Sequence, residues 1–250
     1  MLWRSLPGAI CILLTATTLW AQPPQSKPAY DVAAIKPNLT GSGNSQTHGT
    51  KGQIVFVNQS LRRYIERAWN VATIQIAAPD WLGSLNFDIT AKYPPDASPE
   101  DRQIMLQTLL EDRFKLTIHH ETKEMPGYAL VQAKGGIKLH PVEKTGASSS
   151  NSNGGRIQTL KATNIPMSFL ADFIGRQLGQ AVVDKTAAPG VYDLELRWTN
   201  DDQIPTDPAA ESAPSLFTAI QETLGLRLQA EKVPVDMIVV DHIEREPSEN

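Results

Sequence analysis

The chain has 250 residues, with 23 lysines and arginines against 27 aspartates and glutamates, and a formal net charge of −4. This weakly acidic balance, without a basic cluster, argues against nucleic acid or an anionic membrane surface as a partner. The single cysteine is Cys11, so we expect neither a disulfide framework nor a cysteine metal site.

Residues 1–21 have the pattern of a secretory signal peptide. Arg4 precedes an apolar run at 9–20, which ends beside the small residue Ala21. A run of about 12 apolar residues is too short to cross a bilayer, which takes about 20. A short apolar run between a positive charge and a small residue is typical of a cleaved signal. We therefore expect cleavage next to Ala21, a periplasmic or secreted protein, and no membrane span after cleavage.

Residues 22–52 combine one expected strand with a flexible loop. The stretch "YDVAAIKPN" alternates well enough for a strand, and "LTGSGNSQTHGTKG" is rich in turn-forming residues. A first structural unit is then predicted over residues 53–142. Its expected elements are a strand at 53–58, a helix at 60–71, a strand at 87–93, a helix at 98–114, and a hairpin of 115–125 with 128–134 around Pro126-Gly127.

A second unit, residues 156–250, follows a Ser/Asn/Gly linker at 143–155 and repeats this order. Its expected elements are a strand at 156–164, a helix at 166–179, a strand at 192–198, a helix at 215–225, and a closing hairpin of 226–234 with 235–244. Matched pieces such as "FDITA" with "YDLEL" predict an internal duplication. Each unit is then β-α-β-β-α-β-β, with helices packed on mixed or antiparallel sheets, which is an α+β fold.

Several blocks of the sequence together resemble one family: "PDWLGSLNFDITAKY", "LLEDRFKLTIHHETKEMPGYALV", "VVDKTAAPGVYDLELRW" and "MIVVDHIEREPSEN". From Tyr30 to Asn250 the chain is similar to a secreted acidobacterial-type family of unknown function, with many paralogues in soil bacteria. Related domains occur fused to membrane metallopeptidases of the beta-lactam-sensor type, so the resemblance implies a periplasmic sensing or binding role by analogy. It implies no catalytic residue. The chain departs from the family at Ala187, where the turn usually has glycine.

The residues "DKT", 184–186, resemble the phosphorylated aspartate motif of P-type ion pumps. A pump would also need a glycine at position 187, a hydrolase domain and membrane helices, none of which the sequence contains. Since "AAPG" follows, we interpret Asp184 as a turn residue that hydrogen-bonds its own backbone.

The triplet "HHE" at residues 119–121 is the most polar candidate for chemistry. Alternate residues of a strand share a face, so His119 and Glu121 would lie together and His120 would point to the other side. His119 and Glu121 could supply two metal ligands, whereas zinc takes at least three from the protein. We therefore expect no metal and no cofactor. The interpretation that remains for the triplet is a solvent-facing strand surface.

Two further sets of residues can be interpreted either as structural or as functional. Asp88 and Asp193 stand at equivalent strand positions of the two units, which favours a scaffold role over acid-base catalysis. Trp81 and Leu82 lie in an expected loop, where an exposed tryptophan with an apolar neighbour can anchor a ligand. The alternative for the tryptophans is that they fill the cores.

We therefore interpret the chain as an exported binding or interaction module, non-catalytic, whose partner is an envelope protein or a small ligand. Its expected binding residues are Trp81, Leu82, His119 and Glu121. The alternative is an envelope hydrolase that uses the polar face around His119 and Glu121. A third possibility is a purely structural envelope protein. A concave pocket that gathers His119 and Glu121 with acids from another element would favour the enzyme.

Overall fold

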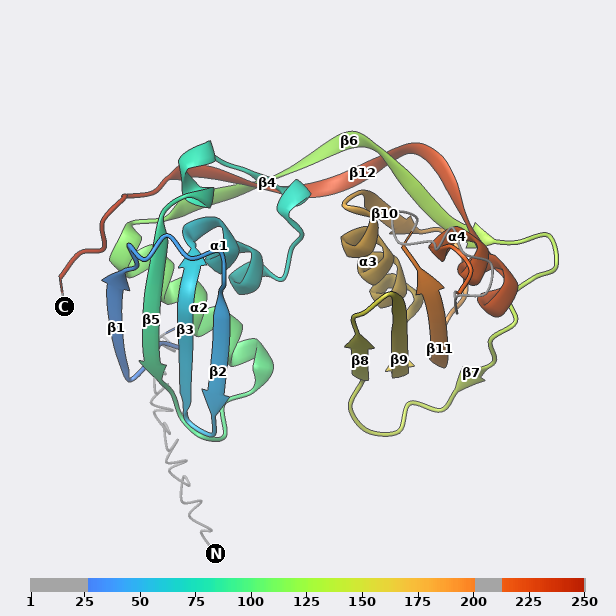
Figure 1. The fold of residues 1–250 in the computed structure, drawn as a ribbon, viewed down its shortest axis with the longest axis horizontal. Helices are drawn as coiled ribbons and strands as arrows, with labels where there is room; N and C mark the ends of the chain where they lie inside the picture. Colours follow the sequence, from blue (N-terminus) through green and yellow to red (C-terminus); the bar gives the residue numbers. More distant parts are fainter. Residues whose placement is uncertain (1–26, 201–212, 250) are drawn as a thin grey trace, which may run out of the picture.

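The structure, a computed structural model, describes residues 27–200 and 213–249. The expected signal at residues 1–21 lies outside these ranges. The described chain forms two lobes, one beneath each end of a long antiparallel ribbon of two strands, β6 (Thr117–Gln132) and β12 (Leu226–His242) (Figure 1). Within the described ranges no helix is both long and apolar enough to span a membrane.

Lobe one is built from the N-terminal half of the chain around an antiparallel sheet of order β1-β5-β3-β2. The sheet strands and the two helices of this lobe are β1 (Val32–Pro37), β2 (Gln46–Thr50), β3 (Gln53–Ser60), α1 (Leu61–Trp69), β5 (Asn86–Lys92) and α2 (Pro99–Phe114). The helices begin where the sequence predicts them, because Ser60 and Ser98 each accept a hydrogen bond from the backbone N–H three residues later.

Lobe two repeats this arrangement around a sheet of order β7-β11-β9-β8. Its sheet strands and helices are β7 (Pro141–Val142), β8 (Ser149–Asn153), β9 (Ile157–Ile165), α3 (Met167–Leu178), β11 (Val191–Thr199) and α4 (Leu216–Ala219), which continues as the π-helical turn η4 (Ile220–Leu224). The same strand order recurs in the same chain order. The internally duplicated α+β fold is therefore confirmed.

The third sheet, of order β10-β6-β12-β4, connects the lobes. Strand β4 (Ile76–Ala77) of lobe one pairs with the C-terminal half of β12, and β10 (Ala181–Asp184) of lobe two pairs with the C-terminal half of β6. Both pairings are parallel. The last strand of each unit thus begins in its own lobe and ends in the other, so the lobes share their strands.

The hairpins expected at the end of each unit are wrong, since β6 and β12 each run on without a turn. Pro126 and Gly127 lie within β6, opposite Lys232 and Glu231, and Pro234 lies within β12. Near these prolines the ribbon has open outer edges, because β10 first pairs at Gly127 and β4 reaches only residues 238–239. A proline whose nitrogen faces an open edge removes no hydrogen bond from the ladder.

Two segments expected as loop or linker contain strands. Residues 46–50, within the expected flexible loop, form β2, and residues 149–153, within the expected linker, form β8. Each is an edge strand at the same place in its sheet, and every residue of both is exposed. Because neither face is buried, these strands lack the apolar alternation by which strands are recognised.

Each lobe has its own apolar core, and a third, smaller core lies between them. The core of lobe one includes Phe56 and Phe114, and that of lobe two includes Trp198 and Leu226. The third core joins residues from the middle of β12 with residues of β10, and Ile74 of lobe one packs against it. Its buried members are Ala181, Val233, Val235 and Met237. This small core is the apolar link between the lobes.

Candidate functional site

The candidate site is a cleft lined by residues from the end of α1, the end of α3 and the ribbon. Figure 1 shows these two helices on the facing sides of the lobes, beneath the ribbon. It consists of two cavities of about 180 Å³ and about 670 Å³ that share part of their walls. The shared wall residues come from both lobes: Asn70, Ala72, Ile74, Gly175 and Arg176. The smaller cavity is closed on its ribbon side by residues 234–236.

The wall in lobe one is made by the sharp end of α1. Asn70 adopts a left-handed conformation, with a φ of 51°, and its N–H donates to the carbonyl of Glu66. This ends the helix and turns the chain into the short helix η1 (Thr73–Gln75), where Gln75 Oε1 accepts a hydrogen bond from the N–H of Ala72. Asparagine tolerates the left-handed conformation, so the sequence favours the turn at this position.

The wall in lobe two is made by the end of α3 and the start of β10. Gly179 ends α3 in a left-handed conformation, and β10 returns directly against the helix. A side chain at position 175 would bring its Cβ to 2.9 Å from the carbonyl oxygen of Gln180. Gly175 therefore permits the close approach of helix and strand that forms this wall.

The two walls meet through few polar contacts. Arg176 Nη1 donates to Asn70 Oδ1 at 3.3 Å, and Gln75 Nε2 donates to the carbonyl of Asp236 on the ribbon at 3.2 Å. The first bond joins the two lobes directly, and both contacts are exposed.

Three arginines line the cleft. Arg63 and Arg67 stand one turn apart on α1, and Arg176 lies on α3. The Arg67 guanidinium lies 5.2 Å from the centre of the Phe56 ring and donates to Thr47 Oγ1 at 3.3 Å. Desolvation lowers the pKa of Arg67, and the nearby positive charge of Arg63 lowers it further. Among the residues that the structure describes, none of the three arginines forms a salt bridge.

Asp172 lies on α3, in the wall of the smaller cavity. The surrounding walls desolvate its carboxyl group and raise its pKa, and Arg176 opposes this shift to a smaller extent. Asp172 is nevertheless exposed to solvent. In the described part of the chain its carboxylate has no salt bridge and accepts no hydrogen bond from a side chain.

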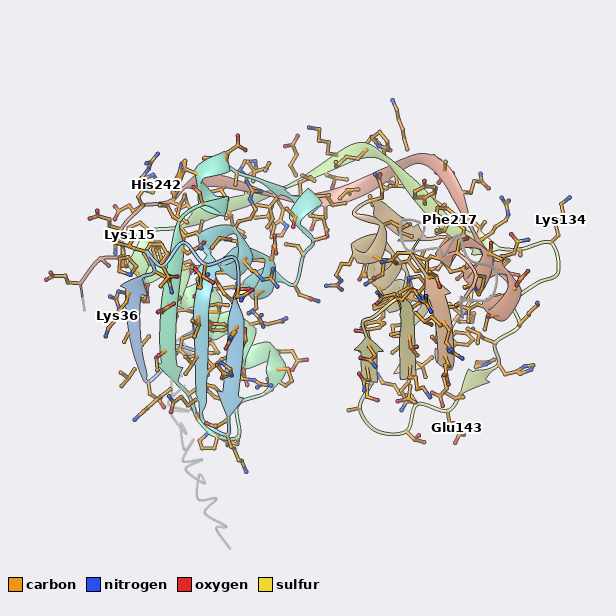
Figure 2. All side chains as sticks on the ribbon, in the orientation of Figure 1. Lys36, Lys115, Lys134, Glu143, Phe217 and His242 are labelled. Carbon is orange, nitrogen blue, oxygen red and sulfur yellow. The ribbon has the colours of Figure 1, made fainter. Side chains whose placement is uncertain are left out.

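The charged side chains labelled in Figure 2 lie elsewhere. Lys36 points out from the outer side of lobe one, and Lys134 from the outer side of lobe two. Neither lines the cleft.

His119 and His120 lie on the ribbon and point to opposite faces, as the alternation predicts. His119 Nδ1 lies 2.8 Å from Asp241 Oδ1, whereas His120 Nδ1 lies 3.1 Å from Asp236 Oδ2. His119 and Glu121 line neither cavity of the cleft. His120 instead reaches the cleft wall through Asp236. Across the described ranges, no three His, Cys, Asp or Glu side chains are grouped to hold a metal ion.

Trp81 and Leu82 lie in the short helix η2 (Asp80–Gly83), away from the cleft walls. Leu82 is fully buried in the core of lobe one, so its side chain cannot contact a ligand at the surface. Trp81 is half-buried, and the Arg245 guanidinium lies 4.9 Å from the centre of its ring. The C-terminal segment therefore covers this tryptophan.

Asp88 and Asp193 stabilise the same backbone feature in each lobe. Asn58 and Asn164 are left-handed, with φ values of 54° and 55°, and lie beside irregularities in the strand pairing. The N–H of Asn58 donates to Asp88 Oδ1 at 2.8 Å, and that of Asn164 donates to Asp193 Oδ1 at 2.9 Å. These contacts support the scaffold interpretation of both carboxylates.

Asp184 ends β10 and forms the turn that its sequence context predicts. Its Oδ1 accepts hydrogen bonds from the N–H and the hydroxyl of Thr186, at 2.9 Å and 2.7 Å. The next residue, Ala187, is left-handed with a φ of 53°. This explains in physical terms why glycine suits that position better than alanine.

The sequence reasoning missed the residues that form the cleft. Its walls come from both lobes and from the ribbon, which no local pattern brings together. One signal was present: Arg63 and Arg67 are four residues apart on a helix, so they share a face, and like charges at that spacing destabilise a helix. Arg67 offsets this cost through its contacts with Phe56 and Thr47, whereas the side chain of Arg63 forms no salt bridge with any residue that the structure describes.

Comparison with known proteins identifies the family of the chain. The model of a family described as a protein of unknown function, DUF3738, matches residues 62–243. No curated protein and no solved structure shows significant similarity to the chain.

Proposed function

Because the chain belongs to the DUF3738 family, whose description assigns no function, we propose a role from the cleft: the protein is a binding module that holds a small ligand between its two lobes. The observation that carries the proposal is the convergence of unpaired charges from both lobes on one concavity. Arg63 and Arg67 come from lobe one, and Asp172 and Arg176 from lobe two.

The dimensions and lining of the cleft support this role. Ligand pockets commonly measure about 300–1,000 Å³, and their few polar groups fix the orientation of the ligand. The larger cavity, about 670 Å³, lies within this range, and the smaller one extends it under the ribbon. Charged groups that have no salt-bridge partner can bind an oppositely charged group of a ligand without first breaking an ion pair.

Export is part of the proposal and rests on residues 1–21, which carry the signal pattern. An exported protein would meet its ligand in the periplasm or outside the cell. Mass spectrometry of the protein recovered from the exported fraction should show a chain that begins next to Ala21. A recovered chain that still contains residues 1–21 would contradict export by a cleaved signal.

The binding role can be tested with a thermal shift screen of the chain from residue 22 onward. The library would contain amino acids, short peptides, monosaccharides and dicarboxylates. A ligand at a concentration 100 times its Kd stabilises the folded state by about 2.7 kcal/mol, which raises the Tm by several degrees.

Two matched variants assign any hit to its site. Ala72→Trp places a large ring in the shared wall of both cavities, whereas Ala147→Trp places the same ring at an exposed position outside both. We expect Ala72→Trp to abolish the shift and Ala147→Trp to preserve it. A ligand that stabilises both variants equally would bind elsewhere and would contradict the cleft as the site.

A further inference from the structure

The cleft has two ends of opposite charge. Arg63 and Arg67 line only the larger cavity, with Glu66 as the one carboxylate there, and that carboxylate already accepts a hydrogen bond from Thr73 Oγ1 at 2.7 Å. This end therefore has an excess of positive charge. Guanidinium groups bind carboxylates with paired hydrogen bonds, so a ligand carboxylate is the natural counterpart.

The opposite end lies under the ribbon and is acidic. Asp172 and Asp236 line only the smaller cavity, whereas Arg176 lines both. Asp236 is already paired with His120, at 3.1 Å, which leaves Asp172 as the carboxylate without a partner among the described side chains. A ligand ammonium group would supply both the charge and the hydrogen-bond donors that this carboxylate lacks.

We propose that the ligand is a short peptide with free termini, its carboxylate held by Arg63 and Arg67 and its ammonium group held by Asp172. This inference rests on the proposed binding role of the cleft. A ligand that carries only one of these two groups matches one end. A phosphate ester would place negative charge near Asp172, and a neutral sugar would leave the arginines without an anion. A zwitterion of peptide length satisfies both ends at once.

Arg176 and Asn70 complete the arrangement. They lie in the wall shared by the two cavities, and their hydrogen bond spans the lobes at that point. Beyond this bond, the Arg176 guanidinium and the Asn70 Nδ2 keep hydrogen-bond donors, which can bind the peptide carbonyls between the ligand's termini. The side chains of the ligand then face the mixed apolar and polar walls, which impose less selection on its sequence.

The test uses native mass spectrometry of the chain from residue 22 onward with three pools of random tripeptides. The pools are identical except that one has free termini, one is amidated at the C-terminus and one is acetylated at the N-terminus. A hydrogen bond to a charged group corresponds to a roughly 10- to 100-fold change in affinity. We therefore expect each modification to weaken binding about tenfold or more. Equal binding of the three pools would overturn the inference.

Two variants locate the two charges of the ligand. Arg63→Gln should remove the preference for a free carboxylate and keep the preference for a free ammonium group, and Asp172→Asn should do the reverse. Arg227→Gln and Asp96→Asn change the same residue types at exposed positions outside the cleft, and both should behave like the parent chain. If either cleft variant weakened the binding of all three pools equally, the substituted residue would not contact a charged terminus of the ligand, and the inference would fail.

The outcomes separate this inference from the proposed function. If a library ligand is lost in Ala72→Trp while the three tripeptide pools remain indistinguishable, the cleft binds a ligand of another class and only the inference fails. If the tripeptide pool with free termini binds Ala72→Trp as well as the parent, both fail, because the site is not the cleft.

Discussion

Arg176 in lobe two donates a hydrogen bond of 3.3 Å to Asn70 in lobe one, in the wall that the two cavities of the cleft share. The lobes are also linked by the small core around Val233 and Val235 and by the hydrogen bond from Gln75 to the ribbon. Two lobes joined by a two-stranded ribbon can change their separation by bending at the ribbon, as in other hinge motions. The bond between Arg176 and Asn70 would then hold the lobes at the separation that the structure has.

Asn70→Gly removes this bond and keeps the left-handed end of α1, because glycine adopts that conformation readily. We expect little change in the free energy of unfolding and a wider range of distances between the lobes. The chain from residue 22 onward has no cysteine, so spin labels at Lys51→Cys and Asn151→Cys can report these distances by pulsed electron resonance. Identical distance distributions with and without Asn70→Gly would show that the bond does not hold the lobes.

Asp88→Ala should destabilise lobe one. Asn58 is only 6% exposed, and the substitution leaves its backbone N–H without the acceptor that it has at 2.8 Å. An unsatisfied buried donor costs about 1–3 kcal/mol. Asp88→Asn keeps an oxygen acceptor and should cost less, while Asp96→Ala at an exposed position should cost little. Urea unfolding measures all three, and equal losses for Asp88→Ala and Asp96→Ala would contradict the scaffold role.

Gly127→Ala should disturb the junction of β6 and β10. An added Cβ would lie 2.5 Å from the carbonyl oxygen of Ala181 and 2.9 Å from the side chain of Val233, which forces the strands apart. Overpacking of this kind usually costs about 1–3 kcal/mol. Gly135→Ala is the control, since its Cβ would meet no atom within 4 Å. Thermal melts that show the same Tm for both variants would contradict the packing of this junction.

The helices were predictable because their signals are local. Ser60 and Ser98 cap helices within a few residues of sequence, and the apolar residues of each helix recur at helical spacing. The ribbon was not predictable in the same way. Pro126-Gly127 indicates a turn when only its neighbours are considered, but the pairing of β6 with residues about a hundred positions later keeps the strand extended. Nonlocal pairing overrides local preference here.

The candidate site was largely hidden from the sequence for the same reason. The predicted residues His119 and Glu121 lie on the ribbon outside the cleft walls, and Leu82 is in a core. A strand pattern shows which side chains share a face, and it separated His119 from His120 as the structure does. The pattern cannot show which faces of the two lobes meet. That depends on β6 and β12, each of which begins in one lobe and ends in the other.

Asp172→Asn should raise the Tm at neutral pH. The pKa of Asp172 is raised above its ordinary value of 3.8 in the folded chain, so just above pH 3.8 the folded chain keeps a proton that the unfolded chain has lost. The free energy of unfolding therefore falls as the pH rises through this window, and the charged carboxylate lowers stability at neutral pH. Below about pH 3 the carboxyl group is protonated in both states, so the advantage of the variant should disappear.

Melting curves of the parent and of Asp172→Asn between pH 3 and pH 7 measure this difference. A Tm difference that is constant over the whole range would not come from the ionisation of Asp172. A parent that is more stable than the variant at neutral pH would mean that the carboxylate has a favourable partner in the folded chain.

Ala187→Gly should stabilise the turn after β10. Ala187 has a φ of 53°, a left-handed conformation that costs an alanine about 1–2 kcal/mol and costs a glycine almost nothing. Glycine also gains about 0.4–1 kcal/mol of conformational freedom in the unfolded chain, which offsets part of the benefit. The net gain should be about 0.5–1 kcal/mol, measured by urea unfolding. Ala188→Gly is the control, because Ala188 packs against the core of lobe two and is not left-handed, so this change should destabilise. A loss of stability in both variants would mean that Ala187 is not held in a left-handed turn.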